Sequence, residues 1–135
     1  MLFRTVSNLD DVIDSRDIIE RISELHAERD DHNAADDGTG SVTPWHEEFP
    51  EDATELSALE ALAKEAEQYA ADWRYGEMLV RDSYFVEYAQ RLLEDCGDVP
   101  KNIPSYLVID WDATARNIRY DYTAVDFGGV TYWIR

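Results

Sequence analysis

The sequence predicts an α+β fold that is mainly helical, with a small antiparallel β-hairpin or sheet at its C-terminus. Two patterns lead to this fold class. Apolar residues recur at helical spacing in several segments, and Gly128 and Gly129 separate two runs of β-forming residues near the end of the chain. Hydrophobic residues make up 44% of the 135 residues, which is enough for a buried core. We therefore treat residues 1–135 as a single acidic domain, with one part at 1–80 and a second at 81–135.

A first helix is predicted from Asp14 or Ser15 to about residue 31, after a brief strand or lead-in at 1–9. Four apolar residues repeat on one side of it: Ile18, Ile19, Ile22 and Leu25. Residues 32–51 contain glycines and prolines and lack this periodicity, so they are predicted to form a loop. Two large aromatic residues, Trp45 and Phe49, are expected to hold the second half of the loop against the body of the protein.

A second helix is predicted from residue 52 or 54 to residue 73. Its apolar side consists of Leu56, Leu59, Ala63, Ala66, Ala70 and Trp73. Residues 77–81 form either a short strand or the approach to the next helix. That third helix begins at Asp82 or Ser83 as its cap and ends at Gly97. Its inward residues are expected to be Phe85, Tyr88, Ala89, Leu92 and Cys96.

The C-terminal segment carries clear local signals. Pro100 and Pro104 bracket an extended loop, and Asp110 is the predicted N-cap of a fourth helix. That helix is expected to bury Trp111, Ala115 and Ile118. A hairpin then closes the chain at 122–135 around the Gly-Gly turn. We expect the helices to pack around one aromatic set: Trp73, Phe85, Tyr88, Trp111 and Tyr122.

The charge of the chain is its most unusual property. Thirty Asp and Glu residues against twelve Lys and Arg residues give a net charge of −18. Such a protein repels nucleic acid and anionic membranes and is attracted to basic surfaces. Cys96 is the single cysteine, so no internal disulfide is expected, and no long apolar segment is present. We expect a cytoplasmic protein that binds neither DNA nor a membrane directly.

The sequence gives little support for catalysis or metal binding. No serine lies in a G-x-S-x-G context, and the three histidines do not have H-E-x-x-H spacing. The acidic run at 30–38 fails as an EF-hand, because Ala35 and Pro44 fall at ligand positions when Gly38 takes the sixth place. We therefore predict no enzymatic activity, no cofactor and no metal site.

The first predicted helix places five acidic residues on a face beside its apolar stripe, and only Arg21 intrudes there. These residues are Asp17, Glu20, Glu24, Glu28 and Asp31. Side chains three and four residues apart on a helix lie about 5–6 Å from each other, comparable to phosphates along one DNA strand. The pattern is typical of a solvated helix face or of a surface adapted to high salt, but it also suits a protein that mimics DNA.

Three segments of the second part resemble the C-terminal region of the ArdA antirestriction family: DSYFVEYAQRLLEDCG at 82–97, IDWDATAR at 109–116 and DYTAVDFGGVTYWIR at 121–135. The resemblance covers residues 82–135. It implies a DNA mimic carried by a phage or mobile element, which forms acidic homodimers and occupies the DNA-binding groove of type I restriction–modification enzymes.

On the matching positions, the resemblance implies further partner-binding acids: Glu87, Glu94, Asp95, Asp110, Asp112, Asp121 and Asp126. Two of them also have structural interpretations, Asp110 as a helix cap and Asp126 as a hairpin residue. Residues 1–80 do not match the family. The target can therefore be another basic DNA-binding host protein, such as a CRISPR complex. The main alternative is a non-enzymatic acidic adaptor or inhibitor without DNA-like geometry.

Overall fold

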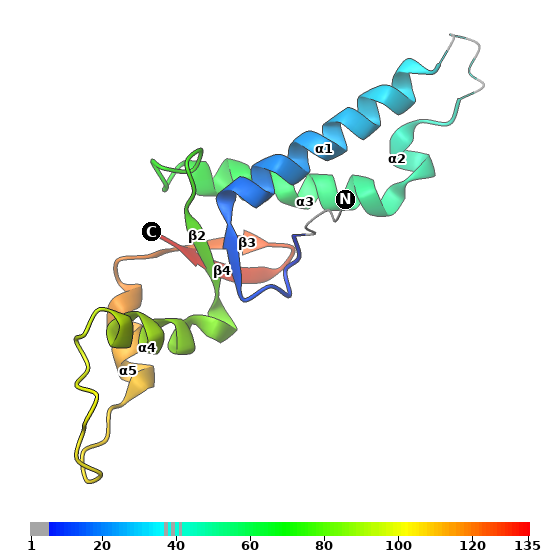
Figure 1. Cartoon of the computed structure of the whole chain (residues 1–135). Coiled ribbons are helices and arrows are strands. Elements are labelled where there is room, and N and C mark those ends of the chain that lie inside the picture. The colour runs from blue at the N-terminus through cyan, green and yellow to red at the C-terminus, as the bar shows by residue number, and fades with distance from the viewer. Residues whose placement is uncertain (1–5, 37, 39, 41) are drawn as a thin grey trace.

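A four-stranded antiparallel sheet lies at the centre of the molecule (Figure 1). The computed structural model describes residues 6–36, 38, 40 and 42–135. The strands follow the order β1-β2-β4-β3 and span Val12–Asp14 (β1), Met78–Arg81 (β2), Thr123–Phe127 (β3) and Val130–Ile134 (β4). The fold is α+β, as predicted. The expected C-terminal hairpin is present, but it is half of a larger sheet that β2 and β1 extend.

Helices lie on both sides of this sheet. On one side are α1 (Ser15–Ala34), α2 (Trp45–Glu48) and α3 (Pro50–Glu67). On the other are the 3-10 helix η1 (Asp82–Tyr84), α4 (Phe85–Asp95) and α5 (Trp111–Arg119). Figure 1 shows α1 running outward from the sheet beside α3, while α4 and α5 pair at the opposite end of the molecule. Within the described part of the chain, no helix combines the length and apolar character needed to cross a membrane.

The alternation of side chains along the strands creates two cores instead of the one that we expected. Leu79 packs with α1 and α3 in the larger core, whereas its neighbour Val80 packs with α4 and α5 in the smaller one. The predicted aromatic set is therefore divided. Trp73 belongs to the larger core, and Phe85 to the smaller, where Tyr88 and Tyr122 pack against it; Trp111 is only half-buried.

The first helix begins where the sequence predicts and ends at Ala34, three residues beyond its predicted end. Asp14 is its N-cap, and the carboxylate accepts a hydrogen bond from the Arg16 amide at 2.9 Å. Its apolar stripe is narrower than predicted: Ile18 and Leu25 are fully buried, but Ile19 is 37% exposed. Of the lead-in expected at 1–9, residues 1–5 lie outside the described residues.

The prediction of a loop throughout 32–51 is wrong, because parts of this segment are helical. This segment contains the last turn of α1, all of α2 and the start of α3. Pro44 caps α2 and Pro50 begins α3, because proline tolerates the first turn of a helix, where its missing N–H is not needed. Trp45 is buried as expected, whereas Phe49 is 41% exposed.

The second long helix is shorter than predicted, since α3 ends at Glu67 and not at residue 73. Residues 68–69 and 71–75 form turns, although Ala70 and Trp73 remain buried. Tertiary hydrogen bonds replace helical ones here. The Ser15 hydroxyl donates to the Trp73 carbonyl oxygen at 2.8 Å and accepts from the Glu77 amide at 2.7 Å. These bonds direct the chain into β2, so residues 78–81 form the strand that was one of two alternatives.

The remaining C-terminal signals are mostly confirmed. The Asp110 carboxylate caps α5 by accepting from the Ala113 amide at 3.0 Å, and Gly97 follows α4 with a positive φ of 77°. Asp82 does not cap the third helix, because its carboxylate binds the Trp133 indole instead, at 2.9 Å. Cys96, which was predicted to point inward, is exposed; α4 ends at Asp95, and Cys96 is its C-cap residue.

Candidate acidic interface

The acidic face of α1 follows the helix from the sheet to its outer end. Glu20, Glu28 and Asp31 are exposed, and Asp17 and Glu24 are half-buried. Asp14 and Ser15 begin the helix at the edge of the sheet, so the buried Ile18 and Leu25 turn their side of α1 toward the core and leave the acidic side outward. All five acids that the sequence places on one face thus belong to one helix surface.

Arg21, which interrupts this face, turns toward α3. Its guanidinium binds both carboxylate oxygens of Glu55, at 2.5 and 3.1 Å, and contacts Glu24 at 3.2 Å. The hydrogen bond with Glu55 is the main reason that the pKa of Arg21 lies above its usual value. The arginine charge is therefore shared between two carboxylates, and Glu24 is less available to a partner than the exposed acids of this face.

The two ends of the α1 face meet different surroundings. Asp17 lies at a cleft of about 310 Å³ beside the sheet, together with Asp10, Asp11 and Tyr84. Glu28 and Asp31 lie at the outer end, where they line a second pocket with residues of α2 and α3. Sequence reasoning did not include Asp10 and Asp11 in the interface. Their position beside the acidic face depends on the pairing of β1 with β2, which no local pattern indicates.

The seven C-terminal acids do not form one group. Glu87, Glu94 and Asp95 lie on α4 and are exposed, as are Asp112 at the start of α5 and Asp121 after it. Asp110 serves as the α5 cap described above. Figure 1 places α4 and α5 on the opposite side of the sheet from α1, so these acids lie apart from the α1 face.

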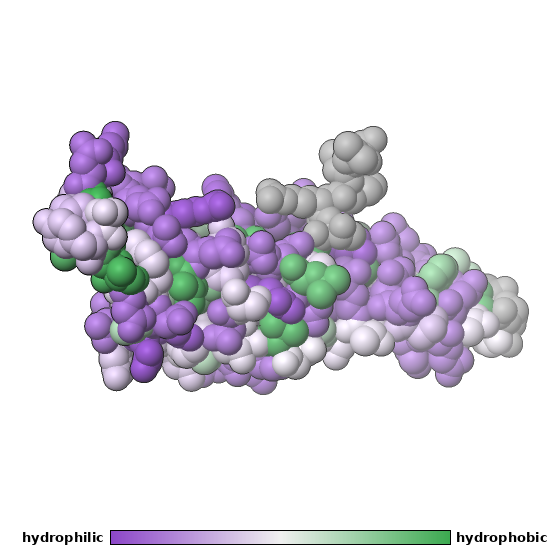
Figure 2. Space-filling view, turned by 90° about the horizontal axis from the view of Figure 1, so that it is seen from below, coloured by the Kyte–Doolittle hydropathy of each residue, from purple (hydrophilic) through white to green (hydrophobic). Residues whose placement is uncertain are grey.

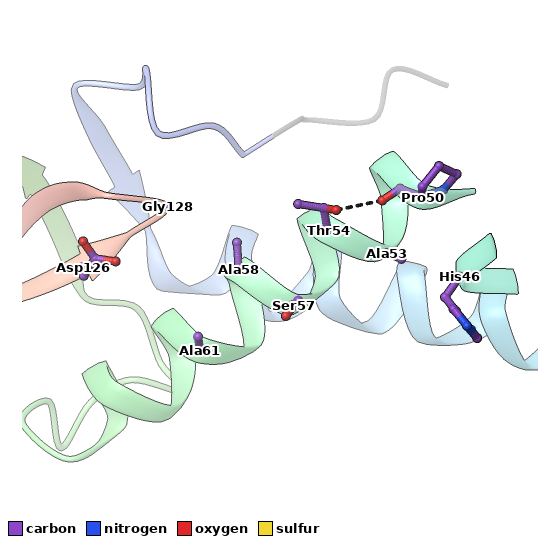
Figure 3. Close-up of a pocket in the computed structure, with 9 residues that line it drawn as sticks. All are labelled: His46, Pro50, Ala53, Thr54, Ser57, Ala58, Ala61, Asp126 and Gly128. Atoms are coloured by element: carbon purple, nitrogen blue, oxygen red, sulfur yellow. Dashed lines mark hydrogen bonds between the residues drawn. The ribbon is translucent and has the colours of Figure 1, made fainter. Parts of the chain in front are cut away.

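Asp126 lies on β3, the edge strand of the sheet that contacts α3. Its backbone amide donates to Glu65 on α3 at 2.8 Å, and its carboxylate accepts from the Gly129 amide at 3.3 Å, within the hairpin turn. The structure thus gives it the hairpin role that was one of its two interpretations. It also forms one wall of the open groove in Figure 3.

The groove in Figure 3 runs along α3 from His46 to the hairpin turn and has a volume of about 590 Å³. Its floor consists of small side chains: Ala53, Thr54, Ser57, Ala58 and Ala61. The Thr54 hydroxyl donates to the carbonyl oxygen of Pro50 at 2.8 Å, so it turns back to its own helix. The polar groups at the two ends belong to separate elements and do not converge on a common point in the groove.

Hydrophilic residues cover most of the face shown in Figure 2, and hydrophobic residues reach the surface in separate patches. The most exposed apolar run lies in the connection between α4 and α5. There Tyr106 is 82%, Leu107 56% and Val108 89% exposed. The stretch 99–109 contains no acidic residue, so this apolar tip carries no negative charge of its own.

An aromatic cluster fixes how α4 and α5 sit on the sheet. Arg119 on α5 lies over the rings of Phe85 and Trp133, at 5.2 and 5.6 Å, and binds Asp82 at 3.2 Å. Burial raises the pKa of the Tyr122 hydroxyl, which lies 3.4 Å from the Tyr88 hydroxyl. The acids on these helices are thus presented on a rigid support.

Within the described residues, no three His, Cys, Asp or Glu side chains are arranged to hold a metal ion. Comparison of the chain with family models, with curated proteins and with solved structures finds no match.

Proposed function

We propose that the protein is an acidic DNA mimic that inhibits a DNA-binding host defence enzyme by occupying its DNA-binding groove. The proposal is carried by the acidic face of α1. From Asp17 to Asp31 this face extends about 21 Å at 1.5 Å per residue. One strand of duplex DNA carries about six phosphates over the same axial length. Five carboxylates on a helix that is anchored by a buried side therefore offer a similar density of negative charge.

The named target rests on the resemblance of residues 82–135 to the ArdA family. Under this proposal the target is a type I restriction–modification complex, and the inhibitor is a cytoplasmic homodimer from a phage or mobile element. It needs no catalytic residue, cofactor or metal, because affinity comes from charge complementarity with a basic groove and from the release of counterions. It binds neither nucleic acid nor membrane itself.

A second candidate is a non-enzymatic adaptor or inhibitor that binds a basic DNA-binding protein, such as a CRISPR complex, without replacing DNA. The exposed run of Tyr106, Leu107 and Val108 favours it, since an apolar anchor contributes to protein–protein affinity and has no counterpart in a phosphate backbone. The two candidates differ in one testable respect: only the mimic excludes DNA from its target.

The target is tested by transferring unmodified phage DNA into restriction-proficient cells that express the protein. The proposal expects the efficiency of infection to rise toward that of a restriction-deficient host. A variant with Glu20→Gln, Glu28→Gln and Asp31→Asn should restore restriction while still being folded. Unchanged restriction in cells carrying each of several type I systems would exclude this target and favour the second candidate.

A further inference from the structure

The outer ends of α1, α2 and α3 enclose a pocket of about 390 Å³ that combines aromatic and acidic side chains. Glu28, Asp31 and His32 come from α1. Trp45 is the first residue of α2, Phe49 follows its last residue, and Asp52 comes from the first turn of α3. The pocket lies in the segment that was predicted to be a loop, where Pro44 caps α2 and Pro50 begins α3. Its volume lies in the range of small-ligand sites, about 300–1,000 Å³.

Contacts with neighbouring residues hold the aromatic side chains of the pocket in place. Trp45 is 4% exposed and holds α2 against the core. Phe49 meets the His32 ring edge to face at 5.5 Å, and His32 is held in turn by the Thr43 carbonyl oxygen at 2.7 Å. Phe49 nevertheless remains 41% exposed. A phenylalanine held in this orientation, with much of its surface open, presents an aromatic surface to a ligand.

The acidic part of the pocket has few internal partners. Within the described part of the chain, the carboxylates of Asp31 and Asp52 form no hydrogen bond or ion pair. Glu28 has a long-range electrostatic attraction to Arg21. His32 also lies 3.4 Å from Glu48, which adds a fourth carboxylate beside the opening. Acids on three helical segments thus lie around the aromatic rings, and no Lys or Arg is among the described residues that line the pocket.

We propose that this pocket binds the guanidinium group of an arginine side chain on the partner protein. A guanidinium stacks on aromatic faces and donates paired hydrogen bonds to carboxylates, so it uses both parts of the pocket at once. Phe49 supplies the ring, and Asp31 on α1 and Asp52 on α3 supply the acceptors. Lysine binds less tightly, because its compact ammonium is more strongly hydrated and cannot stack.

This inference rests on the proposed function in taking a basic protein as the source of the arginine. The pocket also adds a second role to the acidic face of α1. Glu28 and Asp31 are the last two acids of that face, so the array ends in a side-chain-specific site. DNA offers the target no equivalent of Phe49. The pocket therefore contributes affinity that duplex DNA cannot match.

The direct test needs no target protein. N-acetyl-arginine amide is titrated into the protein at constant ionic strength while NMR signals of the Trp45 indole and the Phe49 ring are recorded. We expect saturable shifts at these residues, with the corresponding lysine amide binding several-fold more weakly. Equal shifts with arginine amide and lysine amide would overturn the inference, because they would show only a general attraction of cations to a protein of charge −18.

Two variants separate the aromatic from the acidic contribution. Phe49→Leu leaves the net charge unchanged and should weaken arginine amide about three- to tenfold. Asp52→Asn should weaken it as well, whereas Asp72→Asn makes the same charge change at an exposed turn and should leave it within about twofold. Circular dichroism confirms that each variant is folded. Wild-type affinity in both pocket variants would contradict the proposed site.

The outcome for the pocket is independent of the outcome for the function. Saturable arginine binding together with unchanged restriction in cells would keep the pocket and remove the proposed target. Antirestriction activity that survives Phe49→Leu, with no arginine amide bound by the wild type, would remove the pocket and leave the mimic.

Discussion

Arg21 on α1 binds Glu55 on α3 through two hydrogen bonds of 2.5 and 3.1 Å, which join the acidic helix to its neighbour. Both side chains are mostly buried, at 14% and 27% exposure. The pair explains how a helix with five acids on one face can carry an arginine there without losing its acidic character. The arginine charge is used inside the protein, to hold α1 in place.

Replacing Arg21 with Met should therefore destabilise the protein by about 1.5–3 kcal/mol, since Glu55 loses a charged partner in a partly buried position. Chemical denaturation of Arg21→Met, Glu55→Gln and the double variant measures the coupling. We expect the double variant to be more stable than the sum of the two single effects by about 1 kcal/mol. Simple additivity would show that the pair contributes nothing.

Ser15 is the second point at which α1 is attached. Its hydroxyl is fully buried between the Trp73 carbonyl oxygen and the Glu77 amide. Ser15→Ala should cost about 1–3 kcal/mol of the free energy of unfolding, because two buried backbone groups lose their partner. Ser57→Ala is the matched control on the exposed groove of α3 and should change stability by less than about 0.5 kcal/mol. Equal effects at both positions would contradict this role for Ser15.

Stability should fall at alkaline pH through Tyr132. Burial raises the pKa of its hydroxyl from 10 to about 12, and the hydroxyl donates to the Asp10 carbonyl oxygen at 2.5 Å. The folded state holds this proton more tightly than the unfolded chain. The resulting stability is thus complete below pH 10 and is lost as the pH rises toward 12.

Chemical denaturation at a series of alkaline pH values, with phenolate absorbance recorded in parallel, measures this loss. Tyr132→Phe should be less stable at neutral pH but lose less stability above pH 10. Tyr120→Phe, at a position 83% exposed, should follow the wild type. A Tyr132→Phe curve parallel to the wild type would show that another group controls the alkaline loss.

Neutralising the α1 face should have opposite effects on binding and on stability. The variant with Glu20→Gln, Glu28→Gln and Asp31→Asn removes three exposed charges and leaves the Arg21–Glu55 pair intact. Binding to a basic partner should weaken about tenfold or more, while unfolding becomes harder by about 0.5 kcal/mol as repulsion between neighbours three and four residues apart is relieved.

A matched variant for this comparison changes Glu67→Gln, Asp72→Asn and Asp98→Asn, three exposed acids outside the α1 face with the same total charge. It should bind nearly as tightly as the wild type. Binding that falls equally in both variants would mean that net charge alone decides affinity and that the α1 face has no special role. Thermal denaturation of both variants checks the effect on stability.

The C-terminal part was predictable because its signals are local. The Gly128–Gly129 turn, the Asp110 cap and the glycine after α4 each act within a few residues, and each is where the sequence predicts it. The third helix shows the limit of this approach. Asp82 had the right chemistry for a cap, but Trp133 and Arg119, far away in the sequence, bind its carboxylate.

The features that were missed depend on long-range contacts. Strand β1 has three residues, and it forms because Ile13 pairs with Leu79. No window of sequence around Ile13 contains that partner. The pocket was missed for a different reason: Trp45 and Phe49 stand four residues apart beside two prolines, a spacing that was overlooked in a segment interpreted as loop. The five acids of α1, by contrast, follow directly from helical periodicity.

Competition with duplex DNA for a purified type I restriction–modification complex tests the central claim most directly. The apparent dissociation constant of the protein should rise in proportion to the DNA concentration, with no complex containing both, and affinity should fall steeply with salt. A stable ternary complex of enzyme, DNA and this protein, or an affinity that saturating DNA leaves unchanged, would contradict DNA mimicry.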